Sequence, residues 1–545
     1  MKRILFLTLF LAACGGGNES STSSSIDYSQ AGEVAQGDMF VTANIGGATN
    51  LVPWLAGEAS SSEITQHIYE SLLKYDKDLN IVGSLADSWD VSNDGKTITF
   101  NLRKDVTWHD GEKFDAHDVA TTFNALIDPN TRTPYAGDFQ MVENFDVLDD
   151  DTIRVTYPKA FAPALSSWVG LAILPEHILK LDEDVNETRL KNTAVGTGPY
   201  KLEKWDPQGD TVLVANPNYY KPRANLEKIR IRIIPDLDTQ FLELKAGKLD
   251  SMALKPVQFT RLTSGDTFTK QYAKYAYLGF GYTYLGFNLK NPLFSDKRVR
   301  QALSYATPRQ QLVDGILMGK GRAITGVFKP ETWADNTHLN IHPYDLDKAK
   351  ALLAEAGWTD SNGDGVLDKD GQPFQFTIIT NQGNDQRIKT AEILQQNYGK
   401  IGIKITIQVQ EWRTFLENTL YPRNFQAFIL GWRLSPEPDP YDIWHSSKQG
   451  PQEFNVVGFE NEEADRLMTE ARHTFDQGKR KELLDRFQEI LHEEQPTLLL
   501  YAPETLIALH KRIKNIHSAP AGISHNFEEW YVPTEQQKYK TDIVP

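Results

Sequence analysis

Apolar residues recur along the chain at two spacings, and the alternation between them predicts interleaved strands and helices. Asn93-Asp94-Gly95 lies between two runs in which every second residue is apolar, which predicts a β-hairpin. Apolar residues at helical spacing follow Asp115 and predict a capped amphipathic helix over 116–127. Further helices are expected at 239–246, 345–356, 464–471 and 481–491, and further strands at 229–233, 403–409, 427–430 and 497–501. This interleaving indicates an α/β fold.

Length and charge narrow the class of protein. A chain of 545 residues is too long for one ordinary core and is expected to form two or three domains. Its net charge of −16 argues against nucleic acid or an anionic membrane surface as a partner. Because Cys14 is the only cysteine, the chain has no internal disulfide and no thiolate metal cluster.

The N-terminus has the pattern of an export signal. Two basic residues precede an apolar run over 4–13, which is too short to span a bilayer. Leu11-Ala12-Ala13 directly before Cys14 resembles the bacterial lipobox, which implies a signal peptide over 1–13 and a lipidated Cys14. The alternative is an ordinary signal peptide that contains a cysteine by chance. The small, polar segment 14–37 is expected to act as a flexible tether.

A series of short motifs gives the most specific information about the kind of protein. It begins with Leu85-Ala86-Asp87-Ser88-Trp89 and continues through Trp108-His109-Asp110-Gly111-Glu112 and Gly196-Thr197-Gly198-Pro199-Tyr200 to Gly431-Trp432. In this order the motifs resemble the extracellular solute-binding proteins of family 5, the dipeptide, oligopeptide and nickel group of ABC importers. The resemblance covers about 44–513, nearly the whole mature chain.

The resemblance implies a two-lobed α/β fold of the periplasmic-binding-protein type, with an extra α/β domain inserted in the first lobe. Two crossover strands near Tyr277 and Ala502 would form the hinge. The expected domains are lobe I at 38–56, 195–277 and 505–545, the inserted domain at 57–194, and lobe II at 278–504. Closure of such lobes around a ligand is a common motion.

The resemblance also implies a function. The chain would be a monomeric, lipid-anchored receptor on the extracytoplasmic side of a bacterial membrane, in the periplasm where there is one. It would bind a peptide or another small solute and deliver it to an ABC permease and its ATPase subunits, with no cofactor and no catalysis. An oligosaccharide receptor, an exported hydrolase and a ligand-sensing adaptor are the alternatives.

Six residues are candidates for ligand contact. In peptide binders of the family, an aspartate shortly after Gly-Trp pairs with the α-amino group of the peptide. Here Ser435 stands at the third position after Trp432, which moves the expectation to Asp439, with a turn carboxylate as the alternative. Arg433 suits a ligand carboxylate or lies in solvent. The aromatic candidates, each with core packing as its alternative, are Trp432, Trp412, Tyr284 and Trp54.

Two polar motifs invite other interpretations. Trp108-His109-Asp110-Gly111-Glu112 resembles a catalytic cluster but is interpreted as a structural turn. Asp360, Asn362, Asp364 and Asp368 match the front of a calcium loop, whereas Gly371 stands where a complete EF-hand has glutamate. We therefore expect a glycine-rich hairpin, with a weak calcium site as the alternative.

Overall fold

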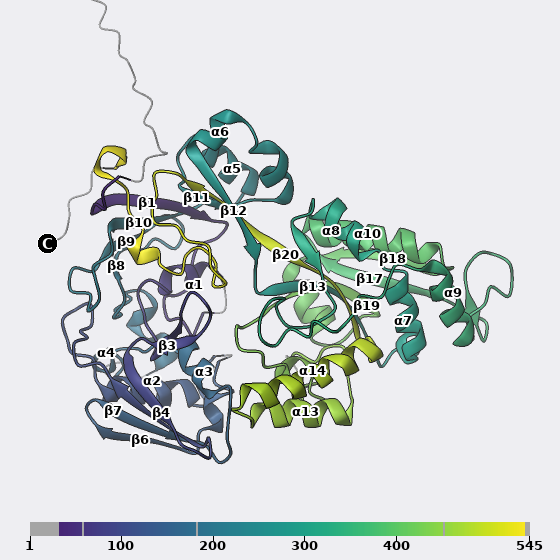
Figure 1. Cartoon of the computed structure of the whole chain (residues 1–545), viewed down its shortest axis with the longest axis horizontal. Helices are drawn as coiled ribbons and strands as arrows, with labels where there is room; N and C mark the ends of the chain where they lie inside the picture. Colours follow the sequence, from purple (N-terminus) through teal and green to yellow (C-terminus); the bar gives the residue numbers. More distant parts are fainter. Residues whose placement is uncertain (1–31, 57–58, 134, 181–183, 451–452, 540–545) are drawn as a thin grey trace, which may run out of the picture.

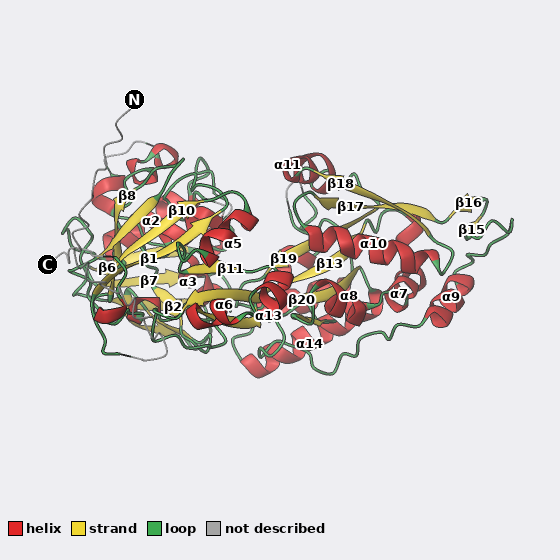
Figure 2. Cartoon of the chain, turned by 90° about the horizontal axis from the view of Figure 1, so that it is seen from above, coloured by secondary structure: helices red, strands yellow, loops and turns green. Residues whose placement is uncertain are grey.

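The structure is a computed structural model that describes residues 32–56, 59–133, 135–180, 184–450 and 453–539. The predicted signal peptide, Cys14 and most of the predicted tether lie outside the described residues. Two bodies lie side by side along the longest axis of the molecule (Figures 1 and 2). Within the described residues, no helix is long and apolar enough to cross a membrane.

The first body contains a four-stranded sheet that joins distant parts of the chain. Its order is β1 (Gly37–Asn44), β10 (Leu226–Ile233), β9 (Thr211–Ala215) and β8 (Tyr200–Lys204), with β1 parallel to β10. Ile229 and Ile231 are buried and Arg230 and Arg232 are not, as the alternation predicts, whereas Ile233 is half-buried. Next to this sheet lie α5 (Leu237–Lys245), β11 (Ser251–Ala253), the π-helix η4 (Gln258–Leu262) and α6 (Asp266–Gln271).

A second sheet, which is antiparallel throughout, lies in the part of the first body away from β1 and β10 (Figure 1). Its order is β4 (Ala86–Val91), β5 (Thr97–Leu102), β7 (Thr152–Thr156) and β6 (Asn144–Asp149). The predicted hairpin is β4–β5, and the predicted helix is α2 (Ala116–Ile127), which Asp115 caps in a capping box. The shorter elements here are α1 (Ala59–Thr65), β2 (Leu73–Tyr75), β3 (Ile81–Gly83), η1 (Phe139–Met141), α3 (Ala164–Gly170), α4 (Glu176–Leu179), η2 (Val185–Glu187) and η3 (Arg189–Lys191).

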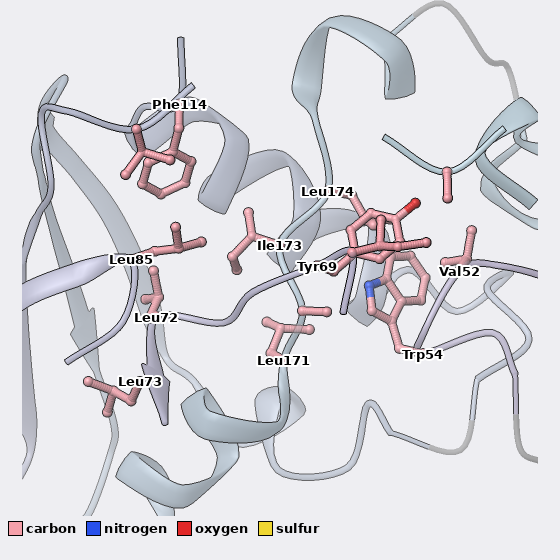
Figure 3. Close-up of a cluster of buried hydrophobic side chains, with 14 of the residues drawn as sticks. Val52, Trp54, Tyr69, Leu72, Leu73, Leu85, Phe114, Leu171, Ile173 and Leu174 are labelled. Atoms are coloured by element: carbon pink, nitrogen blue, oxygen red, sulfur yellow. The ribbon is translucent and has the colours of Figure 1, made fainter. Parts of the chain in front are cut away.

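One apolar core connects the two sheets of the first body. Figure 3 shows part of it: Leu72 and Leu85 lie on one side, Trp54 and Tyr69 on the other, and Leu171 and Ile173 between them. The C-terminal segment completes the core, because Phe527 packs on Phe40 of β1 at a ring distance of 5.4 Å. That segment carries the short helices η7 (Phe527–Glu529) and η8 (Thr534–Gln536).

A large mixed sheet connects the first body to the second. Its path is β11, β20 (Thr497–His510), β13 (Gly281–Phe287), β19 (Ala427–Arg433), β17 (Gln375–Asn381) and β18 (Lys404–Gln410), and β12 (Tyr272–Leu278) and β14 (Gly321–Ala323) also pair with β20. The start of β20 pairs with β13 in the second body and its end pairs with β12 in the first. The sequence predicted only the first five residues of this strand. The exact domain boundaries stay a prediction.

Helices cover the sheet of the second body (Figure 1). The predicted ones are α9 (Leu346–Glu355), α13 (Glu462–Arg472) and α14 (Gln477–Glu494). The others are η5 (Pro292–Phe294), α7 (Lys297–Tyr305), α8 (Arg309–Ile316), α10 (Asp385–Gly399), α11 (Trp412–Thr414), the π-helix η6 (Phe415–Leu420) and α12 (Tyr441–Trp444). Below, "inserted domain" and "lobe II" denote the predicted ranges 57–194 and 278–504.

Candidate ligand-binding cleft

A cleft with a volume of about 1020 Å³ lies between the inserted domain and lobe II. Its walls come from four parts of the chain: the inserted domain, the end of β12, lobe II and a C-terminal turn. Five aromatic and five charged side chains are among the lining residues, and Asp78 and Glu331 belong to the charged ones. The lining includes Tyr75, Ile81, Trp89, Leu165, Tyr277, Leu278, Lys329, Thr332, Trp333, Pro436, Glu437, Phe475, Arg480 and Pro520.

Two further hollows adjoin the cleft through shared residues. A hollow of about 90 Å³ behind the loop after Trp432 shares Lys329, Thr332, Pro436 and Glu437 with it. A hollow of about 460 Å³ in the first body shares Tyr75. The three spaces are therefore neighbours that share parts of their walls.

Glu437 and Arg480 form an ion pair at the wall of the cleft. Burial raises the pKa of Glu437, and the Arg480 guanidinium opposes that shift. The guanidinium also lies over the ring of Trp333, 5.6 Å from its centroid. Glu437 was noted from the sequence only as a neighbour of Asp439. Arg480 was missed, because nothing in its local pattern distinguishes it from the exposed cations around it.

Asp439 lies in a second ion pair. Its Oδ2 accepts a hydrogen bond from Arg472 Nε at 2.7 Å, and its Oδ1 accepts one from the Tyr441 N–H at 3.1 Å. Arg472 also reaches Asp138 of the inserted domain, at 3.3 Å. A ligand amine at Asp439 would therefore share the carboxylate with a buried arginine. The role of Asp439 as an amine partner stays a prediction, and the structure adds this competing cation.

The structure brings two of the aromatic candidates together. Trp432 stacks on Tyr284 with a ring distance of 6.3 Å and an interplanar angle of 3°. Tyr284 is only 2% exposed and belongs to the core of lobe II, whereas Trp432 is half-buried and also contacts the exposed Phe454. Arg433 is exposed at the end of β19 and lines the 90 Å³ hollow.

The remaining two tryptophans lie elsewhere. Trp54 lines the 460 Å³ hollow, is 3% exposed, and has an indole N–H without a hydrogen-bond acceptor among the described residues. Trp412 is 46% exposed on α11 and contacts Phe415. It does not belong to the lining of the cleft or of the two adjoining hollows. Ligand contact by either tryptophan stays a prediction.

The side chains of Trp108 and His109 form hydrogen bonds to other parts of the chain. Trp108 Nε1 donates to Asp118 Oδ2 at 3.2 Å, and the Glu176 N–H donates to Asp118 Oδ1 at 2.7 Å. Burial raises the pKa of Asp118 to about 6. His109 Nε2 lies 3.0 Å from the Gly198 carbonyl, and its Nδ1 accepts from the Gly196 N–H. These bonds fix one turn against another, which agrees with the structural interpretation.

The carboxylates of the calcium-like loop are directed at their own backbone. Asp360 accepts from the N–H groups of Gly363 and Gly365, and Asp368 accepts from Ser361. The segment is a series of bends closed by a bridge between Thr359 and Asp368, and the hairpin of β15 (Asp368–Lys369) and β16 (Gln372–Pro373) follows it. The expected hairpin thus begins at Asp368. No group of three or more His, Cys, Asp and Glu that could hold a metal ion occurs among the described residues.

Comparison with known proteins identifies relatives of this fold. Residues 80–454 match the family described as "Bacterial extracellular solute-binding proteins, family 5 Middle". The chain is 32% identical to the oligopeptide-binding protein AppA of Bacillus subtilis over 540 residues, 97% of each chain. The solved structure of B. subtilis AppA in complex with a nonapeptide is similar at a TM-score of 0.80 and 30% identity, over 92% of this chain and 100% of that one.

A second solved structure has the same fold around another kind of ligand. NikZ from Campylobacter jejuni in complex with Ni(L-His) is similar at a TM-score of 0.80 and 26% identity, over 91% of this chain and 99% of that one. Similar chains thus hold different ligands in one architecture, so the fold alone does not fix the ligand.

Proposed function

This chain belongs to family 5 of the bacterial extracellular solute-binding proteins, which serve ABC importers and are not enzymes, and we propose that it captures oligopeptides. Membership of this family removes the exported hydrolase that the sequence left open. The peptide would lie in the cleft between the inserted domain and lobe II and would be delivered to the permease.

The size and lining of the cleft carry this proposal. Its volume of about 1020 Å³ lies at the top of the range of about 300–1,000 Å³ that is usual for small-molecule sites. Two smaller hollows share lining residues with it. Such a space suits an extended chain of several residues better than a dipeptide or a chelated metal ion. The similarity to AppA, whose structure contains a nonapeptide, supports the same choice.

Location and partners form part of the proposal. Lipidation of Cys14 would hold the protein at the extracytoplasmic face of the membrane, and the polar tether would let it reach both free peptide and the permease. The permease and its ATPase subunits would be the macromolecular partners, with the receptor acting as a monomer. Loss of labelled-peptide uptake in cells that lack this chain would distinguish import from sensing.

A binding experiment tests the choice of ligand. Full-length protein purified in detergent is incubated separately with di- to decapeptides, with oligosaccharides and with Ni(L-His), and bound material is identified by mass spectrometry. We expect saturable retention of intact peptides longer than two residues and a higher melting temperature, because a ligand that binds only the native state stabilises it. Stabilisation by an oligosaccharide or by Ni(L-His) alone would refute the proposal.

A pair of variants tests whether the cleft is the site. Trp333→Ala removes an aromatic side chain that lines the cleft, and we expect it to weaken peptide binding by at least about tenfold, or 1.4 kcal/mol. Trp205 is also half-buried but lies outside the cleft, so Trp205→Ala serves as the control, with unchanged affinity expected. Equal effects of the two substitutions would place the ligand elsewhere.

A further inference from the structure

Two cations line the hollow of about 90 Å³ behind the loop after Trp432. Lys329, which is half-buried, comes from the irregular segment after β14, and Arg433, which is exposed, is the last residue of β19. The volume is several times the roughly 10–15 Å³ that one water molecule needs, so the hollow has room for a small polar group of a ligand. Arg433 was a candidate from the sequence, whereas Lys329 was not.

Phe280 connects the two cations. Lys329 Nζ lies over the Phe280 ring, 4.3 Å from its centroid, and donates to the Pro520 carbonyl at 3.1 Å. The Leu434 N–H donates to the Phe280 carbonyl at 3.2 Å, so the residue after Arg433 is bonded to the residue under the Lys329 ammonium. Contacts on separate parts of lobe II thus direct both cations to one hollow.

The two carboxylates that line the same hollow are each held by an arginine. Glu437 pairs with Arg480, and Asp439 pairs with Arg472 at 2.7 Å. The side chains of these arginines are only 7% and 10% exposed. A ligand ammonium at either carboxylate would have to compete with a buried guanidinium, which loses its ion pair if it is displaced.

The two cations are not held in this way. Among the residues that the structure describes, neither Lys329 nor Arg433 forms an ion pair with a carboxylate. Glu331 favours the charged form of Lys329 electrostatically but is itself paired with Arg322 at 2.7 Å. Burial lowers the pKa of Lys329. An ammonium has three donors, of which the Pro520 carbonyl takes one, so Lys329 can still bind an anionic group.

We propose that Lys329 and Arg433 bind a carboxylate of the peptide, either its C-terminus or an acidic side chain. This inference rests on the proposed function. Lys329 lines both the cleft and the hollow, so a peptide in the cleft can bring a carboxylate to its ammonium. The guanidinium of Arg433 can donate two parallel hydrogen bonds to the same group. The hollow that contains Asp439 thus selects a carboxylate, whereas the sequence predicted an amine there.

Three nonapeptide libraries test this inference on full-length protein in detergent. All of them lack aspartate and have a free N-terminus. The first has C-terminal amides and no glutamate, and therefore no carboxylate. The second has free C-termini and no glutamate, and the third has C-terminal amides and one glutamate at a varied position. Bound peptides are quantified by mass spectrometry at subsaturating concentrations.

The inference predicts a preference for a carboxylate. At least one of the second and third libraries should be retained about tenfold better than the first, which corresponds to 1.4 kcal/mol. A preference for the second library assigns the subsite to the C-terminus, and a preference for the third assigns it to an acidic side chain. The net charge of −16 repels anions, so this preference would have to come from a local site.

Variants test the two cations. Lys329→Gln and Arg433→Gln should each reduce the preference by about threefold or more, whereas Lys329→Arg, which keeps the charge, should retain most of it. Lys274→Gln is the matched control and should leave the preference unchanged. Lys274 is also half-buried, lies 4.8 Å over the Phe259 ring and donates to a carbonyl, but it lines neither the cleft nor the hollow.

Two results would overturn the inference. One is equal retention of all three libraries by the unmodified protein. The other is an unchanged preference in both Lys329→Gln and Arg433→Gln. The readout is the ratio of the bound libraries, so partial unfolding of a variant does not alter it. Retention of none of the libraries would instead refute oligopeptides as the ligand, and this subsite with them.

Discussion

Replacing Arg512 with leucine should loosen the attachment of both chain ends to the first body. Arg512 is 1% exposed and binds Asp250 in a bidentate pair, with Nε to Oδ1 at 2.8 Å and Nη2 to Oδ2 at 2.6 Å. It also pairs with Asp38 at the start of β1 and donates to the Met39 carbonyl. The Val41 N–H donates to the same Asp250 carboxylate. One side chain thus connects the N-terminal strand, the turn before β11 and the C-terminal segment.

The free energy lost in Arg512→Leu depends on the hydrogen bonds that Asp38 and Asp250 keep. Without Arg512, Asp38 still accepts from the backbone N–H groups of Met39, Lys538 and Tyr539, whereas Asp250 keeps the hydrogen bond from the Val41 N–H. Removing one partner of a buried ion pair costs about 3–5 kcal/mol. Because two carboxylates lose their cation here, we expect a value near the upper end. Arg512→Lys should cost less, since an ammonium keeps the charge but cannot reproduce the bidentate geometry.

Hydrogen exchange is the suitable assay, because a chain with several domains does not unfold in two states. The expected result is faster exchange in peptides that cover β1 and 536–539, by a factor that corresponds to about 3–5 kcal/mol of opening free energy. The double variant Arg512→Leu/Asp250→Leu should recover part of the loss, because it removes a buried charge along with its partner. A loss below about 1 kcal/mol in Arg512→Leu, or strict additivity in the double variant, would refute the reasoning.

Two further predictions concern the Gly196-Thr197-Gly198 turn and the histidine bonded to it. A Cβ at Gly196 would lie 1.9 Å from the Ile68 carbonyl oxygen, so Gly196→Ala should lower the melting temperature strongly, whereas Gly170→Ala, with nothing within 4 Å, should not. Burial lowers the pKa of His109 from 6.5 to about 4, so the unfolded chain binds the extra proton first and the stability from neutral His109 is lost as pH falls from 6.5 to 4. The stability difference between wild type and His109→Asn, measured by urea titration, should therefore shrink by up to about 3 kcal/mol over that interval, and a constant difference would contradict the assignment.

The spacing of apolar residues predicted those helices and strands whose buried face depends on residues close to them in the sequence. The 116–127 helix begins directly after its capping residue, Asp115. The Asp115 side chain accepts a hydrogen bond from the Asp118 backbone N–H, and the Asp118 side chain accepts one from the Asp115 backbone N–H. Strand β20 was predicted only to Tyr501, because Pro503, Glu504 and Thr505 interrupt the apolar run. The strand continues since its second half pairs with β12, more than 200 residues earlier in the chain. Such pairing is invisible to any short window of sequence.

The charges of the cleft could not be predicted for the same reason. The sequence offered Asp439 as a carboxylate for a ligand, and the structure places Arg472 on it from a helix end 33 residues later. Around the loop, the three carboxylates Asp138, Glu437 and Asp439 face the two arginines Arg472 and Arg480. Burial raises the pKa of Asp138 and of Glu437, so these two carboxylates take up a proton more readily than exposed ones. The attraction of a ligand cation to this loop would therefore depend on all five groups, and substituting Asp439 alone would also remove one of the two carboxylates that pair with Arg472. Affinity and interdomain distance must consequently be measured on the same variants before a binding role is assigned to any one of these carboxylates.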